Sequence, residues 1–131
     1  MRLISILALV LLNILQTGKF NGTWTPIKQE IGGTILPNTA FSNQRLILTD
    51  STYTVEAESI DKGTVKYDGD KMDIFGKEGV NAGKHFTAIY KFENEQLTIC
   101  YNLQGDGYPE SFGTNGKPMF FLSVFRKETS K

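Results

Sequence analysis

Gly22-Thr23-Trp24, at the head of the run GTWTPIKQEI (residues 22–31), is the stretch that decides the fold. It carries the only tryptophan of the chain and opens the first strand-like segment. The run that can complete a closed sheet lies near the other end of the sequence, at residues 120–126. We therefore predict a β-sheet that closes around Trp24.

The rest of the chain has the pattern of an all-β protein. Short runs rich in Val, Ile, Thr, Tyr and Phe are separated by Gly, Asn, Asp and Pro, which is typical of a sandwich or a barrel. Neighbouring runs can pair as hairpins, and at about eight strands a sheet can close and leave no edge. We predict an eight-stranded antiparallel up-and-down β-barrel, with a two-sheet sandwich as the alternative. The strand-like runs are residues 22–31, 34–36, 45–49, 53–58, 64–67, 71–75, 84–92, 97–102 and 119–126.

The segments between these runs carry their own signals. Pro26 cannot donate to a ladder, so it marks a bulge, a bend or an edge in its strand. Gly32-Gly33 supplies positive φ for a tight turn. Residues 37–43 form a loop with one helical turn and Phe41 as a hydrophobic plug. Residues 61–63, 76–83 and 103–118 are predicted to be a turn, a mobile loop and a long glycine-rich loop, the last anchored by Tyr108 and Phe112.

Residues 1–18 have the features of a secretory signal peptide. Arg2 is followed by an apolar run at residues 3–15, which is shorter than the roughly 17 to 25 residues of a membrane-spanning helix. A buried N-terminal helix is the alternative. We expect cleavage near Thr17, Gly18 or Lys19, a mature domain at residues 19–131, no stable membrane span after leader removal, and export to the periplasm, the cell envelope or the medium.

The charge balance and the cysteine count limit which partners and which covalent links we expect. The 14 basic and 14 acidic residues balance, and loss of Arg2 with the leader leaves one acidic charge in excess. Nucleic acid would call for a basic surface, so we do not expect it as a partner. Cys100 is the only cysteine, so no intramolecular disulfide can form, and we predict that it is a small buried apolar side chain.

Gly22-Thr23-Trp24 with Arg126 resembles the Gly-x-Trp motif and C-terminal arginine of the lipocalin (calycin) superfamily. The resemblance implies that Arg126 lies across Trp24 and closes the base of the barrel. A cation over a Trp ring contributes about 0.5 to 2 kcal/mol. Gly22, Trp24 and Arg126 are therefore the predicted structural closure.

The sequence also resembles a bacterial, planctomycete-type family of lipocalin-like, mostly exported proteins of unknown function. Four stretches carry the resemblance, and they span nearly the whole chain after the leader. They are GTW at 22–24 with Glu30 and Gly32-Gly33, then ILP at 35–37, IYKF at 89–92 with LTICY at 97–101, and Phe112 with VFRK at 124–127. The resemblance implies the fold and the export route, and the family offers no activity to transfer.

We find no set of nucleophile, base and orienting group, so the sequence predicts a protein that is not an enzyme. His85 is the only histidine, and a turn centred on residues 94–95 places Ile89, not His85, near Cys100. Carboxylate pairs at residues 68 and 70, and at 56 and 58, are expected on the solvated surface. Neither a nucleophile elbow nor a phosphate loop occurs, and we expect no metal and no cofactor.

Two functions remain open. In the first, the barrel binds a small apolar or amphipathic ligand, because its inner face combines apolar walls with hydroxyl tips. In the second, the core is filled and the protein is a cell-envelope interaction or inhibitor-like module that uses the loops at residues 76–83 and 103–118, with a partner that the sequence does not identify. The candidate lining residues are Trp24, Tyr53, Tyr67, Met72, Phe86, Tyr90, Tyr101 and Phe121.

Overall fold

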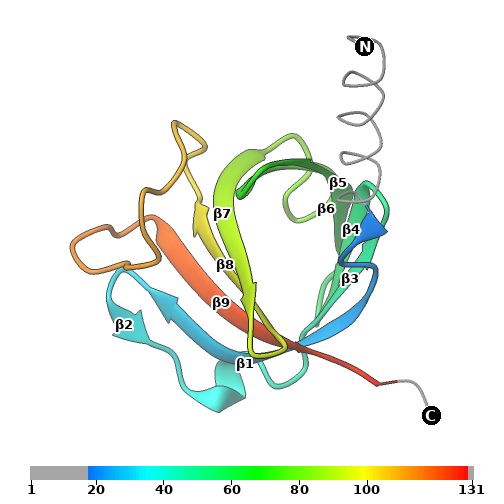
Figure 1. Ribbon diagram of the computed structural model, residues 1–131, viewed down its shortest axis with the longest axis horizontal. Helices are drawn as coiled ribbons and strands as arrows, with labels where there is room; N and C mark the ends of the chain where they lie inside the picture. The colour runs from blue at the N-terminus through cyan, green and yellow to red at the C-terminus, as the bar shows by residue number, and fades with distance from the viewer. Residues whose placement is uncertain (1–17, 130–131) are drawn as a thin grey trace, which may run out of the picture.

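The computed structural model describes residues 18–129 as a β-barrel in which the first and last strands pair with each other (Figure 1). Every pairing in the barrel is antiparallel. The elements are β1 (Gly22–Ile31), β2 (Thr34–Ile35), the 3-10 turn η1 (Asn38–Ala40), β3 (Arg45–Thr49), β4 (Thr52–Glu56), β5 (Asp61–Asp68), β6 (Lys71–Gly79), β7 (His85–Glu93), β8 (Gln96–Asn102) and β9 (Phe120–Lys127).

Eight strands form the closed ring. The order is β1, β3, β4, β5, β6, β7, β8 and β9, and β9 returns to β1 from Trp24↔Lys127 to Ile31↔Phe121. The short β2 pairs only with the end of β1, beside the ring. The predicted eight-stranded antiparallel up-and-down β-barrel is confirmed, and the sandwich alternative is wrong.

Strand β1 is the seam of the barrel. It pairs with β3 through Gly22–Trp24 and with β9 along most of its length, and the register shifts between Pro26 and Lys28. A proline lacks the N–H that a regular ladder needs, so the predicted irregularity is confirmed at this residue. Gly22 has φ of 142°, and a Cβ there would come within 2.5 Å of the Lys127 side chain. The glycine of the Gly-x-Trp motif therefore lets Lys127 cross the seam.

Alternation of side chains along the strands separates an inner core from an outer face, as period-2 geometry requires. On β7, Ala88 and Tyr90 belong to the inner cluster, whereas Ile89 belongs to a second cluster outside the ring. The inner cluster contains Phe20, Trp24, Leu46, Leu48, Tyr53, Val65, Met72, Ile74, Ala88, Tyr90, Leu97, Ile99 and Phe125.

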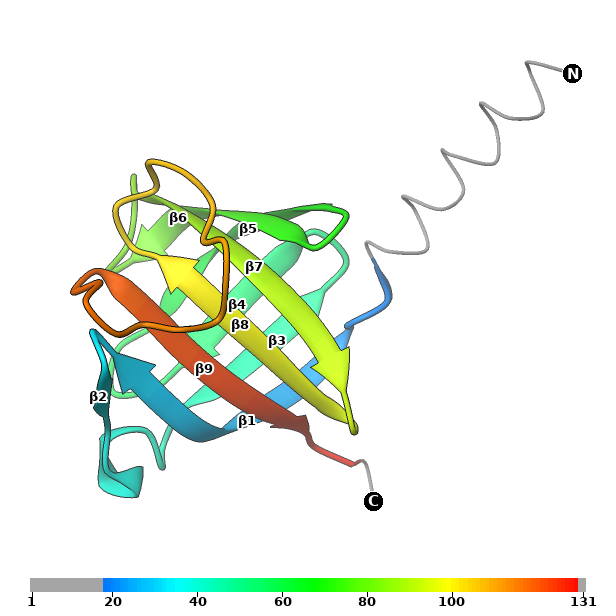
Figure 2. The same cartoon turned by 60° about the vertical axis from the view of Figure 1, so that its left-hand side comes forward.

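The outer cluster lies under the segment between β8 and β9. Ile89, Cys100 and Leu122 are buried there against Phe112 and Phe120, and Figure 2 shows the segment crossing the outside of these strands. Cys100 is 0% exposed, so the predicted small buried apolar side chain is confirmed. The segment at residues 103–118 is therefore a cover for the barrel wall.

This cover has more anchors than Tyr108 and Phe112. Thr114 is fully buried, donates to Glu30 and accepts from the backbone N–H of Gly33 at 2.9 Å. At the other end of the segment, the Asn102 amide donates to Asp106 at 2.7 Å and to the Gly107 carbonyl at 3.0 Å. These polar contacts fix the segment because they satisfy groups that the fold removes from water.

Two predicted segments are wrong. Residues 61–63 are not a turn, because β5 begins at Asp61 and pairs there with Val55 and Gly79. Residues 76–83 are not one loop either, since β6 continues to Gly79 and the following turn is closed by backbone bonds, including Gly83 N–H to the Gly76 carbonyl at 2.9 Å. The 3-10 turn at residues 38–40 and the burial of Phe41 agree with the prediction for that loop.

Residues 1–17 lie outside the described part of the chain, so the predicted signal peptide and its alternative, a buried N-terminal helix, both fall there. Within residues 18–129, no helix has the length and apolar character needed to cross a membrane.

Candidate functional site: a cavity in one half of the barrel

The two ends of the barrel are built differently. Tight turns at residues 50–51, 69–70 and 94–95 join the strands at one end, which we call the closed end. The longer connections at residues 32–44, 57–60, 80–84 and 103–119 lie at the other, which we call the open end. The first described residues and the end of β9 both lie at the closed end (Figure 2).

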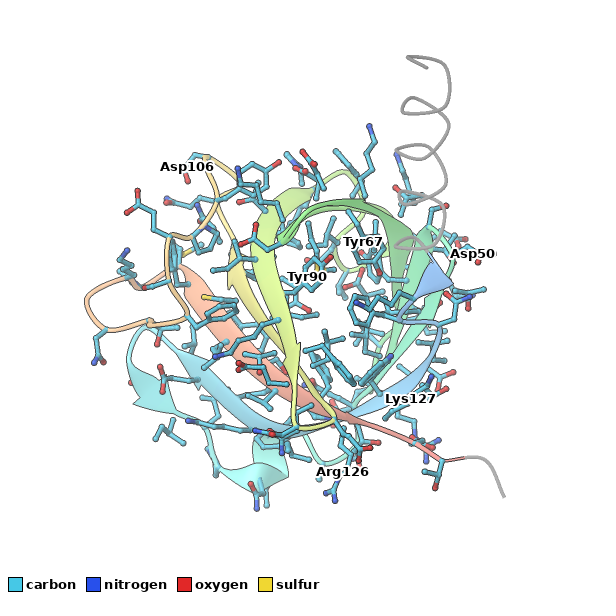
Figure 3. All side chains as sticks on the ribbon, in the orientation of Figure 1. Asp50, Tyr67, Tyr90, Asp106, Arg126 and Lys127 are labelled. Atoms are coloured by element: carbon cyan, nitrogen blue, oxygen red, sulfur yellow. The ribbon has the colours of Figure 1, made fainter. Side chains whose placement is uncertain are left out.

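An aromatic cluster fills the closed end. Phe20 lies 5.3 Å from Tyr90, 6.2 Å from Tyr67 and 6.4 Å from Trp24, measured between ring centroids. The Trp24 indole N–H donates to the Phe20 carbonyl at 2.9 Å, and Figure 3 shows Tyr67 and Tyr90 inside the ring of strands. The pairs with Tyr90 and Trp24 are edge-to-face, and such pairs add about 0.5 to 1.5 kcal/mol each beyond their burial.

Hydrogen bonds fix the segment that precedes β1 at the same end of the barrel. The Asn21 amide donates to the Asp50 carboxylate at 3.1 Å, and the Asp50 backbone N–H donates to the Asn21 side-chain oxygen at 2.6 Å. Asp50 adopts φ of 52° in the β3–β4 turn. The segment that carries Phe20 is therefore held across the base of the barrel.

The closing cation is Lys127, so the prediction of Arg126 is wrong by one residue. Lys127 Nζ lies 5.9 Å from the centroid of the Trp24 ring. Arg126 pairs with Thr25 and its side chain is exposed, on the outside of the barrel (Figure 3). Because side chains alternate along a strand, the residue directly opposite inward-facing Trp24 faces inward and its neighbour does not.

Above this cluster the interior opens into a cavity of about 290 Å³. Five of the predicted lining residues reach it: Tyr53, Met72, Phe86, Tyr101 and Phe121. The other three, Trp24, Tyr67 and Tyr90, belong to the aromatic cluster of the closed end. Aliphatic side chains complete the wall, among them Leu48, Val55, Val65, Ile74 and Ile99.

Asp61 is the acidic group of the cavity wall, and it is 9% exposed. The Tyr53 hydroxyl donates to Asp61 Oδ1 at 2.7 Å, and the Asn81 amide donates to Oδ2 at 2.7 Å. Gly63 makes room for this arrangement, since it lies opposite Tyr53 and a Cβ there would come within 2.7 Å of the tyrosine ring. A bulge between Lys62 and Gly63 lies at the same place, and bulges commonly redirect side chains.

A second polar group lies on the wall formed by β1 and β9. The Gln29 amide donates to the Gln44 side-chain oxygen at 2.9 Å and to the Ser123 hydroxyl at 3.3 Å. Gln29 and Ser123 are almost completely buried. These residues give the cavity neutral hydrogen-bonding groups beside its apolar wall.

The tyrosines of the cavity stay protonated at neutral pH. Burial raises the pKa of Tyr53 and Tyr101 well above the usual value for a phenol, and the nearby Asp61 charge raises both further. The Tyr101 ring also stacks on Phe121, with centroids 5.7 Å apart and planes at 25°. The wall therefore presents neutral phenols beside aromatic faces.

The rim next to Asp61 is apolar and exposed. Ile60 is 53% exposed and Val80 is 60% exposed, and the Val80 backbone N–H donates to the Ile60 carbonyl at 3.4 Å. Val80 also lines the cavity. This pair gives the mouth an apolar edge.

The groups considered for catalysis lie outside the barrel. Ile89 is opposite Cys100, as predicted, and His85 lies beside Gly105. His85 Nε2 is 2.8 Å from the Asp73 carboxylate, whose other oxygen accepts from the Tyr108 hydroxyl at 2.6 Å. Among the described residues, no group of three or more His, Cys, Asp or Glu side chains has the placement of a metal site.

Sequence reasoning missed the polar residues of the cavity. Asp61 and Asn81 fell in segments interpreted as a turn and a loop, and Gln29 was treated only as part of a strand. Strict alternation from Trp24 places Gln29 on the outer face of its strand. The register shift between Pro26 and Lys28 turns it inward, and the sequence marks that shift only through Pro26. The position of Asp61 in the site depends on its contacts with Tyr53 on β4 and with Asn81 in the turn between β6 and β7, and local sequence does not encode such contacts.

Comparison with known proteins gives a structural likeness. One of the matching solved structures is a crystal structure of a mutant of the fluorescent protein UnaG, at 14% sequence identity and a TM-score of 0.41. The match covers 86% of this chain and 98% of that one. No protein-family model and no curated protein matches the sequence.

Proposed function

We propose that the barrel binds a small apolar or amphipathic molecule in the cavity of its open half. The cavity of about 290 Å³ between the aromatic cluster and the rim is the observation that carries this function. Ligand sites are concave, mostly apolar and supplied with a few polar groups, with volumes from about 300 to 1,000 Å³. The cavity is at the lower limit of that range, so the ligand is small.

The size of the ligand follows from the volume. Liquid water occupies about 30 Å³ per molecule, so the space corresponds to roughly ten water molecules or a similar number of non-hydrogen ligand atoms. A molecule of that size reaches the mixed wall, with Phe86 and Phe121 as apolar contacts and the Gln29 and Asp61 groups as polar ones. We do not propose a catalytic step, since the wall holds a carboxylate without an accompanying nucleophile.

The packing of the segment at residues 103–118 favours ligand binding over the interaction module. That segment covers Cys100 and Leu122 and is fixed by Thr114. An interaction module would use it as a free binding loop, whereas here its apolar and polar anchors serve the barrel wall. The filled interior expected for such a module is present only at the closed end.

Cavity filling tests the function. Val55 faces the cavity, and its neighbour Thr54 lies at the next position of β4, on the other face. We expect 4-phenyl-1-butanol, titrated by calorimetry and amide NMR shifts, to bind the wild-type protein and Thr54→Phe, and to bind Val55→Phe at least tenfold more weakly. Thermal melts of both variants control for folding. Equal binding by all three proteins would contradict the proposal.

We also propose that the protein is exported as a lipocalin-like member of the bacterial family that its sequence resembles. The support is the leader-like sequence at residues 1–18. Phe20 is buried and its carbonyl accepts from Trp24, so cleavage that spares the barrel must occur before Phe20. Mass spectrometry of the protein from a secreting host is expected to show a mature N-terminus at or before Lys19. A mature chain that lacks Phe20, or protein retained in the cytoplasm, would contradict this.

A further inference from the structure

Asp61 is a carboxylate without a cation. Within residues 18–129 the ion pairs join Arg45 to Glu128, His85 to Asp73 and Lys91 to Glu93, and Asp61 belongs to none of them. Its partners are the neutral Tyr53 hydroxyl and Asn81 amide, one on each oxygen. An ionised carboxylate has about four acceptor sites, so two donors leave about half of its capacity for a third partner.

The cavity supplies no positive charge of its own to that carboxylate. Arg45 is the only basic residue among the lining residues, and its Nε is 2.9 Å from Glu128 with a side chain that is 58% exposed. Arg45 is therefore neutralised on the outside of the barrel. The cavity has the electrostatics of one buried negative charge, and burying such a charge is unfavourable unless a counter-charge accompanies it.

The walls around the carboxylate are aromatic. Tyr53, Phe86, Tyr101 and Phe121 line the same cavity, and aromatic faces attract ammonium groups through their quadrupole. A carboxylate with spare acceptor capacity, aromatic walls and an apolar floor together match a molecule with a protonated amine at one end and a hydrocarbon body. A carboxylate head would meet Asp61 with like charge.

We propose that the ligand of this cavity is a small amphipathic amine whose ammonium group pairs with Asp61. This inference rests on the proposed function and specifies its ligand class. The Tyr53 hydroxyl and Asn81 amide hold the carboxylate towards the mouth side of the cavity, next to Val80. The ammonium group would then lie near the rim, and the hydrocarbon body would extend towards Val65 and Ile99.

Three probes that share one hydrocarbon body test the ligand class. They are 4-phenylbutylamine, 4-phenyl-1-butanol and 4-phenylbutyrate, titrated at pH 7 by calorimetry into protein produced from the full 131-residue chain. We expect the amine to bind at least tenfold more tightly than the carboxylate and several-fold more tightly than the alcohol. This preference is measured on the wild-type protein, so it does not depend on how any variant folds.

Removing the charge of Asp61 tests its role. Asp61→Asn keeps an oxygen that accepts from Tyr53, and we expect it to bring the amine and the alcohol within about threefold of each other while the alcohol binds as before. Asp70→Asn is the matched control, because Asp70 is an exposed carboxylate in the β5–β6 turn at the closed end. We expect this variant to keep the full amine preference.

The outcomes separate the two proposals. If the alcohol binds but the carboxylate binds as tightly as the amine, the amine inference is overturned and ligand binding stands. If Asp61→Asn folds and keeps the preference, the assignment of Asp61 is overturned. If none of the three probes binds the wild-type protein, the proposed function fails and the amine inference fails with it.

Discussion

The closed and open ends of the barrel use similar residues for different purposes. At the closed end Phe20, Trp24, Tyr67 and Tyr90 pack against one another. At the open end Tyr53, Phe86, Tyr101 and Phe121 line a cavity. The difference lies in what enters each end, because the chain inserts Phe20 into the closed end and places the buried polar group Asp61 in the wall of the open end.

This contrast separates stability from binding within one sheet. A barrel of eight strands is just wide enough either to be filled by its side chains or to hold one small ligand, and this chain does both along a single axis. The aromatic cluster supplies contacts that hold the strands together. The open half has fewer such contacts because it contains the cavity.

Replacing one large aromatic side chain at each end by alanine should give the largest difference in stability between the two ends. Trp24 is 2% exposed in the filled half, so we expect Trp24→Ala to lower the free energy of unfolding by about 3 to 5 kcal/mol, as for other buried aromatic residues. Phe121 is only half-buried against the cavity, and we expect Phe121→Ala to cost about 1 to 2 kcal/mol. Urea melts followed by far-UV circular dichroism provide both values.

The ligand assay provides the control for this comparison. Phe121→Ala should weaken binding of the aromatic probes although its effect on stability is the smaller one, because its ring faces the cavity. A loss below 1 kcal/mol for Trp24→Ala, or equal losses for the two variants, would show that the two ends do not differ as described.

Alkaline pH should lower the free energy of unfolding through the buried groups Cys100 and Tyr67. Burial raises the pKa of Cys100 from its ordinary value of 9.0 to about 11, and it raises the pKa of Tyr67 to about 12. Both groups are neutral when protonated, and the unfolded chain loses these protons at lower pH than the folded one. Their contribution to stability is therefore fully present below about pH 9 and is lost as the pH rises through 11 and 12.

We expect the loss from Cys100 to be on the order of 2 kcal/mol above pH 11. Urea melts between pH 7 and 11.5 measure it, and Cys100→Ala is the control, since without the thiol the decline should begin about one pH unit higher, where tyrosines ionise. A free energy of unfolding that is flat to pH 11 in the wild type would contradict the burial of these groups.

Much of the barrel could be predicted because its signals are local. The alternation on β7 assigns Phe86 and Tyr90 to the inner face, and the turn at Asn94–Glu95 fixes which residue of β8 lies opposite each residue of β7. Even the outer cluster had a signal, since residues 119–126 are apolar on both faces. A strand with two apolar faces needs a cover on each, and the segment containing Phe112 supplies the outer one.

The division of the interior could not be predicted from the sequence. Tyr67 and Tyr53 look alike on their strands, yet one packs against Phe20 and the other hydrogen-bonds to Asp61. Which of them faces an empty space depends on Phe20, whose position follows from the contact between Asn21 and Asp50 across the base. Such contacts join residues far apart in the chain, and no periodicity encodes them.

Substitutions at Lys127 and Arg126 are expected to have the smallest effects on stability, and they test the geometry of the closed end most directly. Register places Lys127 directly opposite Trp24, with Nζ 5.9 Å from the ring, and turns Arg126 outward. We expect Lys127→Ala to cost about 0.5 to 1 kcal/mol, the range of an exposed cation–π contact, and Arg126→Ala to change stability by less than about 0.5 kcal/mol, as for a surface residue.

A double-mutant cycle with Trp24→Leu isolates the contact, because it subtracts whatever each substitution does alone. Coupling of a few tenths of a kcal/mol or more between positions 24 and 127, with none between 24 and 126, would assign the closure to Lys127, in keeping with the alternation of the strand. The opposite pattern would restore the arginine of the Gly-x-Trp motif and would require β9 to shift by one residue. Such a shift would turn Phe121 and Phe125 outward, away from the cavity and the core that they now line.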